Sequence, residues 1–175
     1  VLPSEINANV DHFSTLLQTA VNEKAFPGGV LLAAKDGEIF FHDAFGFHTY
    51  DEKRKMRKSD IFDLASISKV VGTTSAIMKL YDDKLIDLND KVVTYLPRFK
   101  GKQKKYFNHK SNISIKHLLT HSSGLPPFRK YFLMERDKES VLDSIYNTEP
   151  IYGLEEKTVY SDVGIITLGK IVEKV

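Results

Sequence analysis

The chain has 175 residues, of which 42% are hydrophobic and 27% are charged, and its formal net charge is +2. This balance is typical of a folded globular chain and argues against intrinsic disorder. The absence of cysteine excludes disulfides and thiolate metal sites and leaves the redox compartment open. No apolar run approaches the roughly 18 to 20 residues that span a bilayer, and no signal peptide is evident at the N-terminus, although one removed from a longer precursor would leave the same sequence.

Residues 1–60 predict a helix followed by a β-hairpin. Apolar residues recur at helical spacing between residues 5 and 23. Two β-rich runs, Val30 to Ala34 and Ile39 to Phe47, flank Asp36-Gly37, a dipeptide typical of two-residue hairpin turns. We therefore expect the first domain to place a helix on an antiparallel sheet. A two-stranded hairpin is marginal alone, so this sheet is expected to be incomplete within the chain.

Residues 61–175 predict a mostly helical domain. Apolar residues from Ile67 to Tyr81 keep a 3.6-residue period with few charges, which predicts a long helix, buried on most sides, with Ser66 at its N-terminus. Four further helices are expected at residues 91–95, 114–121, 138–146 and 162–175.

A basic run without acidic residues lies near the middle of the chain. Between Lys91 and Met134 there are ten Lys or Arg residues and no Asp or Glu. The densest part is residues 98–110, the basic segment, which contains Arg98, Lys100, Lys102, Lys104, Lys105 and Lys110. Such a run could bind nucleic acid or an anionic polymer. A solvated, mobile loop is the favoured interpretation, because no folded nucleic-acid motif accompanies the charge.

Ser66 and Lys69 stand three residues apart where the long helix is predicted to begin. With 13 serines and 20 lysines in the chain, roughly 1.5 such spacings are expected by chance and one is found, so the position of the pair carries the argument. At a helix N-terminus the positive end of the dipole favours an alkoxide on the serine. Lys69, one turn later, can reach that oxygen and act as a base if burial lowers its pKa. Taken alone, the pair is more often a capping serine and a surface lysine.

Two later motifs complete a pattern. His117-Leu-Leu-Thr-His121-Ser-Ser-Gly-Leu-Pro126 and Tyr160-Ser161-Asp162-Val-Gly164 follow Ser66-Ile-Ser-Lys69 in order. Together they resemble the serine β-lactamase and penicillin-binding-protein superfamily, in particular the class C-like branch with D-alanyl-D-alanine peptidases and family VIII esterases. The resemblance implies an α+β fold of the β-lactamase/transpeptidase type, an antiparallel sheet flanked by helices plus a mostly helical domain. It runs from about Ala25 to the last residue and corresponds to the N-terminal half of the family.

The resemblance also implies roles for four residues. Ser66 matches the acyl-accepting nucleophile, Lys69 its base partner, and Tyr160 the tyrosine that relays protons to the leaving group and the deacylating water. A phenol is useful as a base only beside a cation, which Lys69 would supply. Asp162 takes a substrate-binding position where the family usually has Asn, and it lacks the amide donor for a substrate carbonyl. This departure favours ester hydrolysis over β-lactam turnover.

The family's third motif, Lys or His, any residue, then Gly, is not found on a predicted strand. Lys35-Asp36-Gly37 has the letters but lies in the hairpin turn. In the family that strand supplies one oxyanion-hole donor, and losing such a donor costs roughly 3 kcal/mol of transition-state stabilisation. We therefore expect little activity from this chain alone. The C-terminal half of the fold, or a second chain, is expected to complete the sheet.

His117 and His121 have the i, i+4 spacing that can hold zinc on a helix. Leu118 replaces the Glu of the zinc-protease motif and no third ligand is evident. Structural histidines are the favoured interpretation, and no metal or other cofactor is expected.

The leading hypothesis is a serine hydrolase that forms an acyl-enzyme with an ester, an amide such as a peptidoglycan-like D-alanyl peptide, or a β-lactam. The resemblance alone implies a periplasmic or secreted location. One alternative is a binding module without turnover that holds an anionic or cell-wall polymer through the basic segment. Another is a structural fragment whose partner half lies on another chain.

Overall fold

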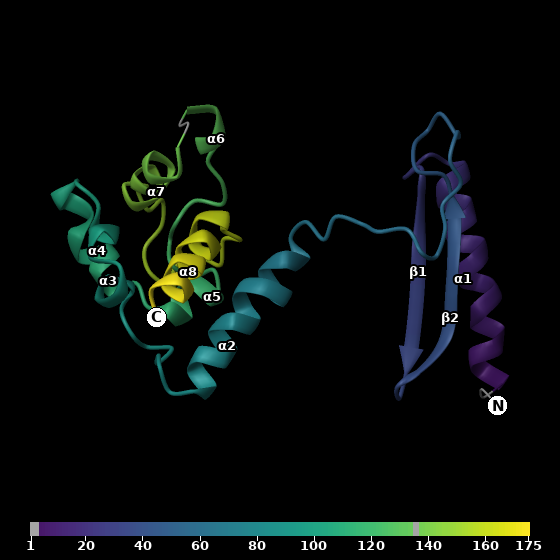
Figure 1. Ribbon diagram of the computed structural model, residues 1–175, viewed down its shortest axis with the longest axis horizontal. Helices are drawn as coiled ribbons and strands as arrows, with labels where there is room; N and C mark the ends of the chain where they lie inside the picture. The colour runs from purple at the N-terminus through teal and green to yellow at the C-terminus, as the bar shows by residue number, and fades with distance from the viewer. Residues whose placement is uncertain (1–3, 135–136) are drawn as a thin grey trace. The chain divides into compact units, whose positions relative to one another are not determined.

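The computed structural model describes residues 4–134 and 137–175 and divides into two compact units, Val1–Asp63 and Leu64–Val175 (Figure 1). None of the helices among these described residues is both long enough and apolar enough to cross a membrane.

The first unit is a β-hairpin with one helix against it (Figure 1). Helix α1 (Ser4–Asn22) precedes strands β1 (Gly28–Lys35) and β2 (Glu38–Gly46), which pair antiparallel. The turn residues Asp36 and Gly37 have φ of 53° and 82°, the two positive values that a type I′ turn requires. The helix and hairpin predicted from the sequence are confirmed.

Aromatic rings join α1 to the hairpin. Phe41 and Phe45 of β2 are buried and stack in parallel, 6.3 Å between ring centroids. The ring of Phe13 in α1 meets Phe41 edge-on at 5.9 Å. In the described part of the chain the sheet has these two strands, so it is open, as expected.

The second unit is mostly helical (Figure 1). Its elements are a π-helical segment η1 (Lys69–Thr74) continuing into α2 (Ser75–Asp82), then α3 (Val92–Tyr95), the 3-10 turns η2 (Pro97–Lys100) and η3 (Lys104–Tyr106), α4 (Phe107–Asn112), α5 (Ile115–Leu119), α6 (Tyr131–Met134), α7 (Lys138–Tyr146) and α8 (Asp162–Lys174). The core draws on α3, α5, α7 and α8 through side chains at most 1% exposed, among them Val92, Ile115, Leu118, Ile145, Leu168 and Ile171. The four helices predicted between residues 91 and 175 are confirmed within a residue or two at most ends.

The long helix after Ser66 is also confirmed, but its predicted burial is wrong. The helix begins at Ile67 and ends at Asp82. Ile77 is buried at 1% exposure, whereas Val70, Val71 and Met78 are 57 to 65% exposed. Within this unit the helix packs on α8 along one side. An apolar period identifies a helix, but it does not say how many neighbours surround that helix.

The basic segment is folded rather than a solvated loop. It forms η2, η3 and the first turn of α4. Arg98 pairs with Glu139 and Asp143 of α7, and the ammonium of Lys102 lies 2.9 Å from Asp143. Lys110 is 2% exposed and donates hydrogen bonds to main-chain carbonyls at the end of α7. The acidic partners of Arg98 and Lys102 lie on α7, later in the chain, and not in the neighbouring sequence. The prediction of a solvated, mobile loop is wrong because the basic run alone does not show these partners.

Candidate active site

Ser66 lies in a turn immediately before the helix that carries Lys69. The preceding residue, Ala65, has φ of 42°, a left-handed conformation that residues with a Cβ rarely adopt. The amide of Lys69 donates to the carbonyl of Ser66 at 3.1 Å, which closes the first turn. The side chain of Ser66 is exposed. The prediction that Ser66 sits at the helix N-terminus is confirmed.

The structure brings the four predicted site residues together around the ammonium of Lys69. Its Nζ donates to Oγ of Ser66 at 3.0 Å and lies 2.9 Å from Oδ1 of Asp162. The same nitrogen lies 5.2 Å from the ring centroid of Tyr160. One cation thus contacts a hydroxyl, a phenol ring and a carboxylate.

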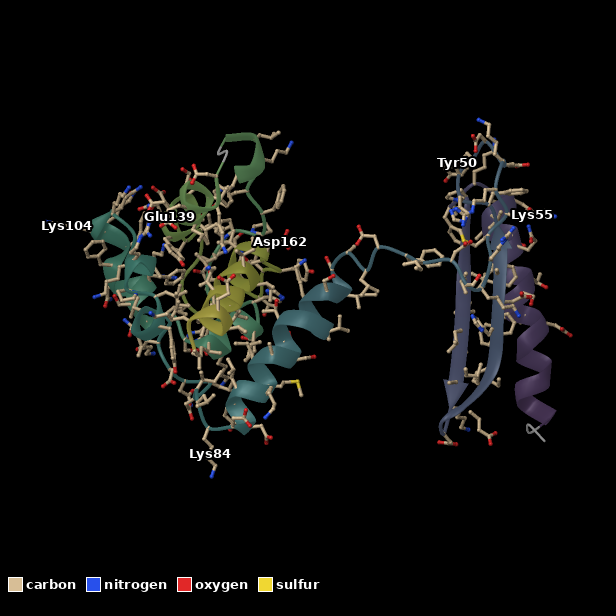
Figure 2. All side chains as sticks on the ribbon, viewed as in Figure 1. Tyr50, Lys55, Lys84, Lys104, Glu139 and Asp162 are labelled. Atoms are coloured by element: carbon tan, nitrogen blue, oxygen red, sulfur yellow. The ribbon has the colours of Figure 1, made fainter. Side chains whose placement is uncertain are left out.

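The start of α8 holds Tyr160 and Asp162 in place. Ser161 is the N-cap of α8: its Oγ accepts from the amide of Gly164 at 3.2 Å and donates to the carbonyl of Pro126 at 2.7 Å. The amide of Asp162 donates to the carbonyl of Pro127 at 2.8 Å. Figure 2 shows Asp162 at the N-terminal end of α8. The second and third motifs of the sequence are therefore joined by hydrogen bonds at the site.

The charges of the site favour a protonated lysine. The Asp162 carboxylate, and after it the Tyr160 phenol, raises the pKa of Lys69, whose side chain keeps 21% of its surface exposed. The condition under which Lys69 would act as a base, a pKa lowered by burial, is therefore not met. Hydrogen bonds with Ser66 and then with Lys69 lower the pKa of Tyr160. The arrangement makes the tyrosine, rather than the lysine, the better acceptor for the proton of Ser66.

The two histidines of the second motif lie in different local structures and have different hydrogen-bond partners. His117 lies on α5, where its Nδ1 accepts from the amide of Ser114 at 3.1 Å and completes the capping box. Helix α5 ends at Leu119, and His121 follows in a left-handed turn with φ of 57°. The pair therefore does not share one helix face. Over the described residues, no group of three or more His, Cys, Asp or Glu side chains could hold a metal ion.

The sequence predicts a structural histidine at position 121 but does not predict its contact with Tyr160. Its ring lies 4.8 Å from the Tyr160 ring, and its Nδ1 accepts from the amide of Ser161 at 3.1 Å. These partners are about forty positions away along the chain, so no local spacing could reveal them.

An apolar cavity of about 430 Å³ opens beside Lys69 and Asp162. Its walls come from the segment around Lys69, from the residues after Pro127 and from α7 and α8, and its apolar lining includes Phe128, Tyr131, Val141, Ile145 and Ile166. Such a cavity is suited to the apolar part of a ligand. No local sequence pattern predicts it, because its walls come from four separate segments.

Comparison with known proteins identifies the family. The family model Beta-lactamase matches residues 11–175 of the chain. The chain belongs to the β-lactamase family. N-acetylmuramyl-L-alanine amidase of Bacillus subtilis (strain 168) is 34% identical over 195 aligned positions, which cover 98% of this chain and 44% of the amidase. Penicillin-binding protein 4* of the same strain is 33% identical, with 93% of this chain and 36% of that protein covered.

The fold of this β-lactamase family member also matches solved structures. EstCE1, a hydrolase with promiscuous acyltransferase activity, superposes with a TM-score of 0.80 at 24% identity, covering 98% of this chain and 48% of EstCE1. The α+β fold of the β-lactamase type expected from the motifs is confirmed. The chain spans less than half the length of each of these three proteins.

Proposed function

We propose that this member of the β-lactamase family is a serine hydrolase in which Ser66 forms an acyl-enzyme. The observation that carries the proposal is the 3.0 Å contact between Nζ of Lys69 and Oγ of Ser66. Because Asp162 favours the charged form of that lysine, the ammonium can stabilise the negative charge that develops on the serine oxygen during attack.

Tyr160 is the base in this mechanism. As Oγ of Ser66 bonds to the substrate's carbonyl carbon, the serine proton passes to the phenolate oxygen of Tyr160, which thereby becomes a neutral phenol. The bond from the carbonyl carbon to the leaving oxygen or nitrogen then breaks, and the leaving group takes that proton. Water, deprotonated by Tyr160, attacks the ester on Ser66, and the proton returns to the serine as the acid is released. The lowered pKa of Tyr160 supports this role.

An ester with an apolar acyl group is the substrate class that the site favours. The cavity of about 430 Å³ beside Lys69 offers apolar walls against which an acyl chain can pack. Asp162 stands where an amide side chain would donate to a substrate carbonyl, and a carboxylate has no such donor. Both observations place esters ahead of β-lactams.

A peptidoglycan-type amide is the second candidate substrate. It is supported by the names of two relatives, an N-acetylmuramyl-L-alanine amidase and a penicillin-binding protein. The binding-module alternative is less favoured, because Arg98, Lys102 and Lys110 of the basic segment are engaged within the fold.

Covalent labelling tests the proposal. A fluorescent fluorophosphonate should label the native full-length protein, and Ser66→Ala should abolish the label, while Ser68→Ala, the neighbouring serine, should retain it. Tyr160→Phe should slow labelling by roughly 100-fold or more, as expected for loss of a general base. Absence of label on the folded wild-type protein would overturn the proposal. Hydrolysis rates for p-nitrophenyl esters of increasing chain length, beside a muramyl-L-alanine peptide, then separate the two substrate classes.

A further inference from the structure

His121 holds both sides of Tyr160. The amide of Val159, just before the tyrosine, donates to the main-chain carbonyl of His121 at 2.8 Å. The amide of Ser161, just after it, donates to Nδ1 of the imidazole at 3.1 Å. Between these two bonds the rings of His121 and Tyr160 meet at 4.8 Å and 47°. One histidine therefore fixes the backbone on either side of the phenol and also contacts its ring.

The backbone of His121 is held in a conformation that requires a reason. Its φ of 57° is left-handed, a conformation that residues with a Cβ adopt uncommonly. The turn sends the carbonyl and the ring of His121 toward the same segment, Val159 to Ser161. Unfavourable backbone conformations persist where the surrounding structure enforces them, often at functional sites.

The hydrogen bond from Ser161 defines the protonation state of the ring. An imidazole accepts at Nδ1 only when it is neutral, with its proton on Nε2. Burial lowers the pKa of His121, and the charge of Lys69 lowers it further, while Asp162 acts in the opposite direction. The phenol of Tyr160 also faces the ring. Protonation at Nδ1 would set two N–H groups against each other and break the bond to Ser161.

We propose that His121 is a positioning residue: its neutral ring holds Tyr160 against Ser66 and Lys69, and a proton on Nδ1 releases it. This rests on the proposed function, since it takes Tyr160 as the base for Ser66. His121 itself touches neither the nucleophile nor a reacting atom in this account; it acts through the tyrosine.

Substitutions of His121 can distinguish the effects of its ring, of its hydrogen bond with the amide of Ser161 and of its titration. His121→Gly removes the ring without left-handed strain. His121→Asn tolerates the left-handed backbone, offers Oδ1 as acceptor for the amide of Ser161, and does not titrate. His117→Asn is the matched control, because Nδ1 of His117 also accepts a main-chain amide, that of Ser114, away from the tyrosine.

The measurement is the rate of fluorophosphonate labelling of the native full-length protein between pH 4.5 and 9. In the wild type the logarithm of the rate, plotted against pH, should fall as the pH decreases. The slope should be one below the pKa of Tyr160, where the tyrosine takes up a proton, and two below the pKa of His121, where the histidine takes up a second proton. The second step should lie below pH 6.5, the ordinary pKa of histidine. His121→Asn should keep a slope of one throughout, and His121→Gly should label roughly 10- to 100-fold more slowly at pH 8.

Two results would overturn the positioning role and leave the proposed function standing. One is wild-type labelling that depends on Ser66 but keeps a slope of one throughout. The other is labelling of His121→Gly at the wild-type rate. Loss of all wild-type labelling would instead overturn the proposed function. A readout independent of activity is the nitrogen-15 spectrum of His121. The wild type should show an unprotonated Nδ1 and a protonated Nε2 at pH 8, and a protonated Nδ1 there would contradict the proposal.

Discussion

A single carboxylate sets the charge state of the site. Asp162 lies 2.9 Å from the Lys69 ammonium and raises its pKa, and its negative charge opposes formation of a phenolate on Tyr160. A family that usually has Asn at this position has no such charge there. The departure from the motif is therefore more than a lost donor for substrate, because it also changes the pKa values of Lys69 and Tyr160, the two groups proposed to activate Ser66.

We expect Asp162→Asn to move both limbs of the pH profile for labelling toward acid. Without the carboxylate the pKa of Lys69 falls, so the alkaline limb begins at lower pH. The pKa of Tyr160 also falls, because the phenolate loses a neighbouring negative charge, so the acid limb shifts in the same direction. Removing a charge at this distance should shift each limb by roughly one pH unit.

The control for this shift is Glu173→Gln, which makes the same change of charge near the other end of α8. It should leave both limbs in place. An Asp162→Asn profile that coincides with the wild type would show that the ion pair does not govern Lys69 and Tyr160.

The sequence predicts the residues of the site better than their electrostatics. Ser66, Lys69, Tyr160 and Asp162 were identified by motifs, and they converge in the structure. The motifs do not decide in which direction the pKa of Lys69 shifts, since a pKa depends on partners in space, and its partner Asp162 is 93 positions away. The tie between His121 and Tyr160 was missed for the same reason.

At the scale of elements, regular periodicity is predictable and packing is not. Helices α7 and α8 were predicted almost to the residue because each has a clear apolar period and a capping residue, Asp137 or Ser161. Helix α6 was missed because four residues are too few to show a period. The π-helical turn of η1 runs through Gly72-Thr73-Thr74, poor helix formers that give no specific signal for it.

Lys110 joins three of these elements and gives the fold a pH dependence of its own. It extends from α4, donates to the carbonyls of Tyr146 and Thr148 where α7 ends, and lies 4.6 Å from the ring of Phe99 in η2. Burial lowers its pKa to about 8. In the unfolded chain the pKa is near 10.4, so between these values the unfolded state holds one more proton. The contribution of Lys110 to stability therefore rises with pH over that range.

We expect the free energies of unfolding of the wild type and of Lys110→Met to differ increasingly as the pH rises. At pH 7 the methionine relieves the burial of a charge but leaves two carbonyls without a donor, so the two variants should differ little. Between pH 7 and pH 10 the wild type should gain up to about 3 kcal/mol over the variant. Urea denaturation across this range measures the gap. Lys104→Met, an exposed lysine of the same segment, should show a constant difference, and a constant difference for Lys110→Met would contradict the argument.

At the scale of the whole molecule, the apolar core is distributed unequally between the two units. In Leu64–Val175 a cluster of 16 buried hydrophobic residues surrounds α8. Among the side chains described in Val1–Asp63, Phe41 and Phe45 are the buried hydrophobic ones. A two-stranded hairpin with one helix and so small a core is marginal on its own, whereas a single core of the second unit's size can support cooperative folding.

We therefore expect residues 64–175 to fold when expressed alone and residues 1–63 to lack a cooperative transition. Circular dichroism should show a single sigmoidal melt for the 64–175 chain, and Leu168→Ala within it should lower stability by about 2 to 5 kcal/mol, because Leu168 is fully buried. In the intact chain, Phe41→Ala should weaken the first unit while leaving the melt of the second unchanged. Two results would show that the two units fold as one: a non-cooperative melt of residues 64–175, or equal effects of Phe41→Ala on both units. The division between a hairpin domain and a helical domain carrying Ser66 would then have to be abandoned.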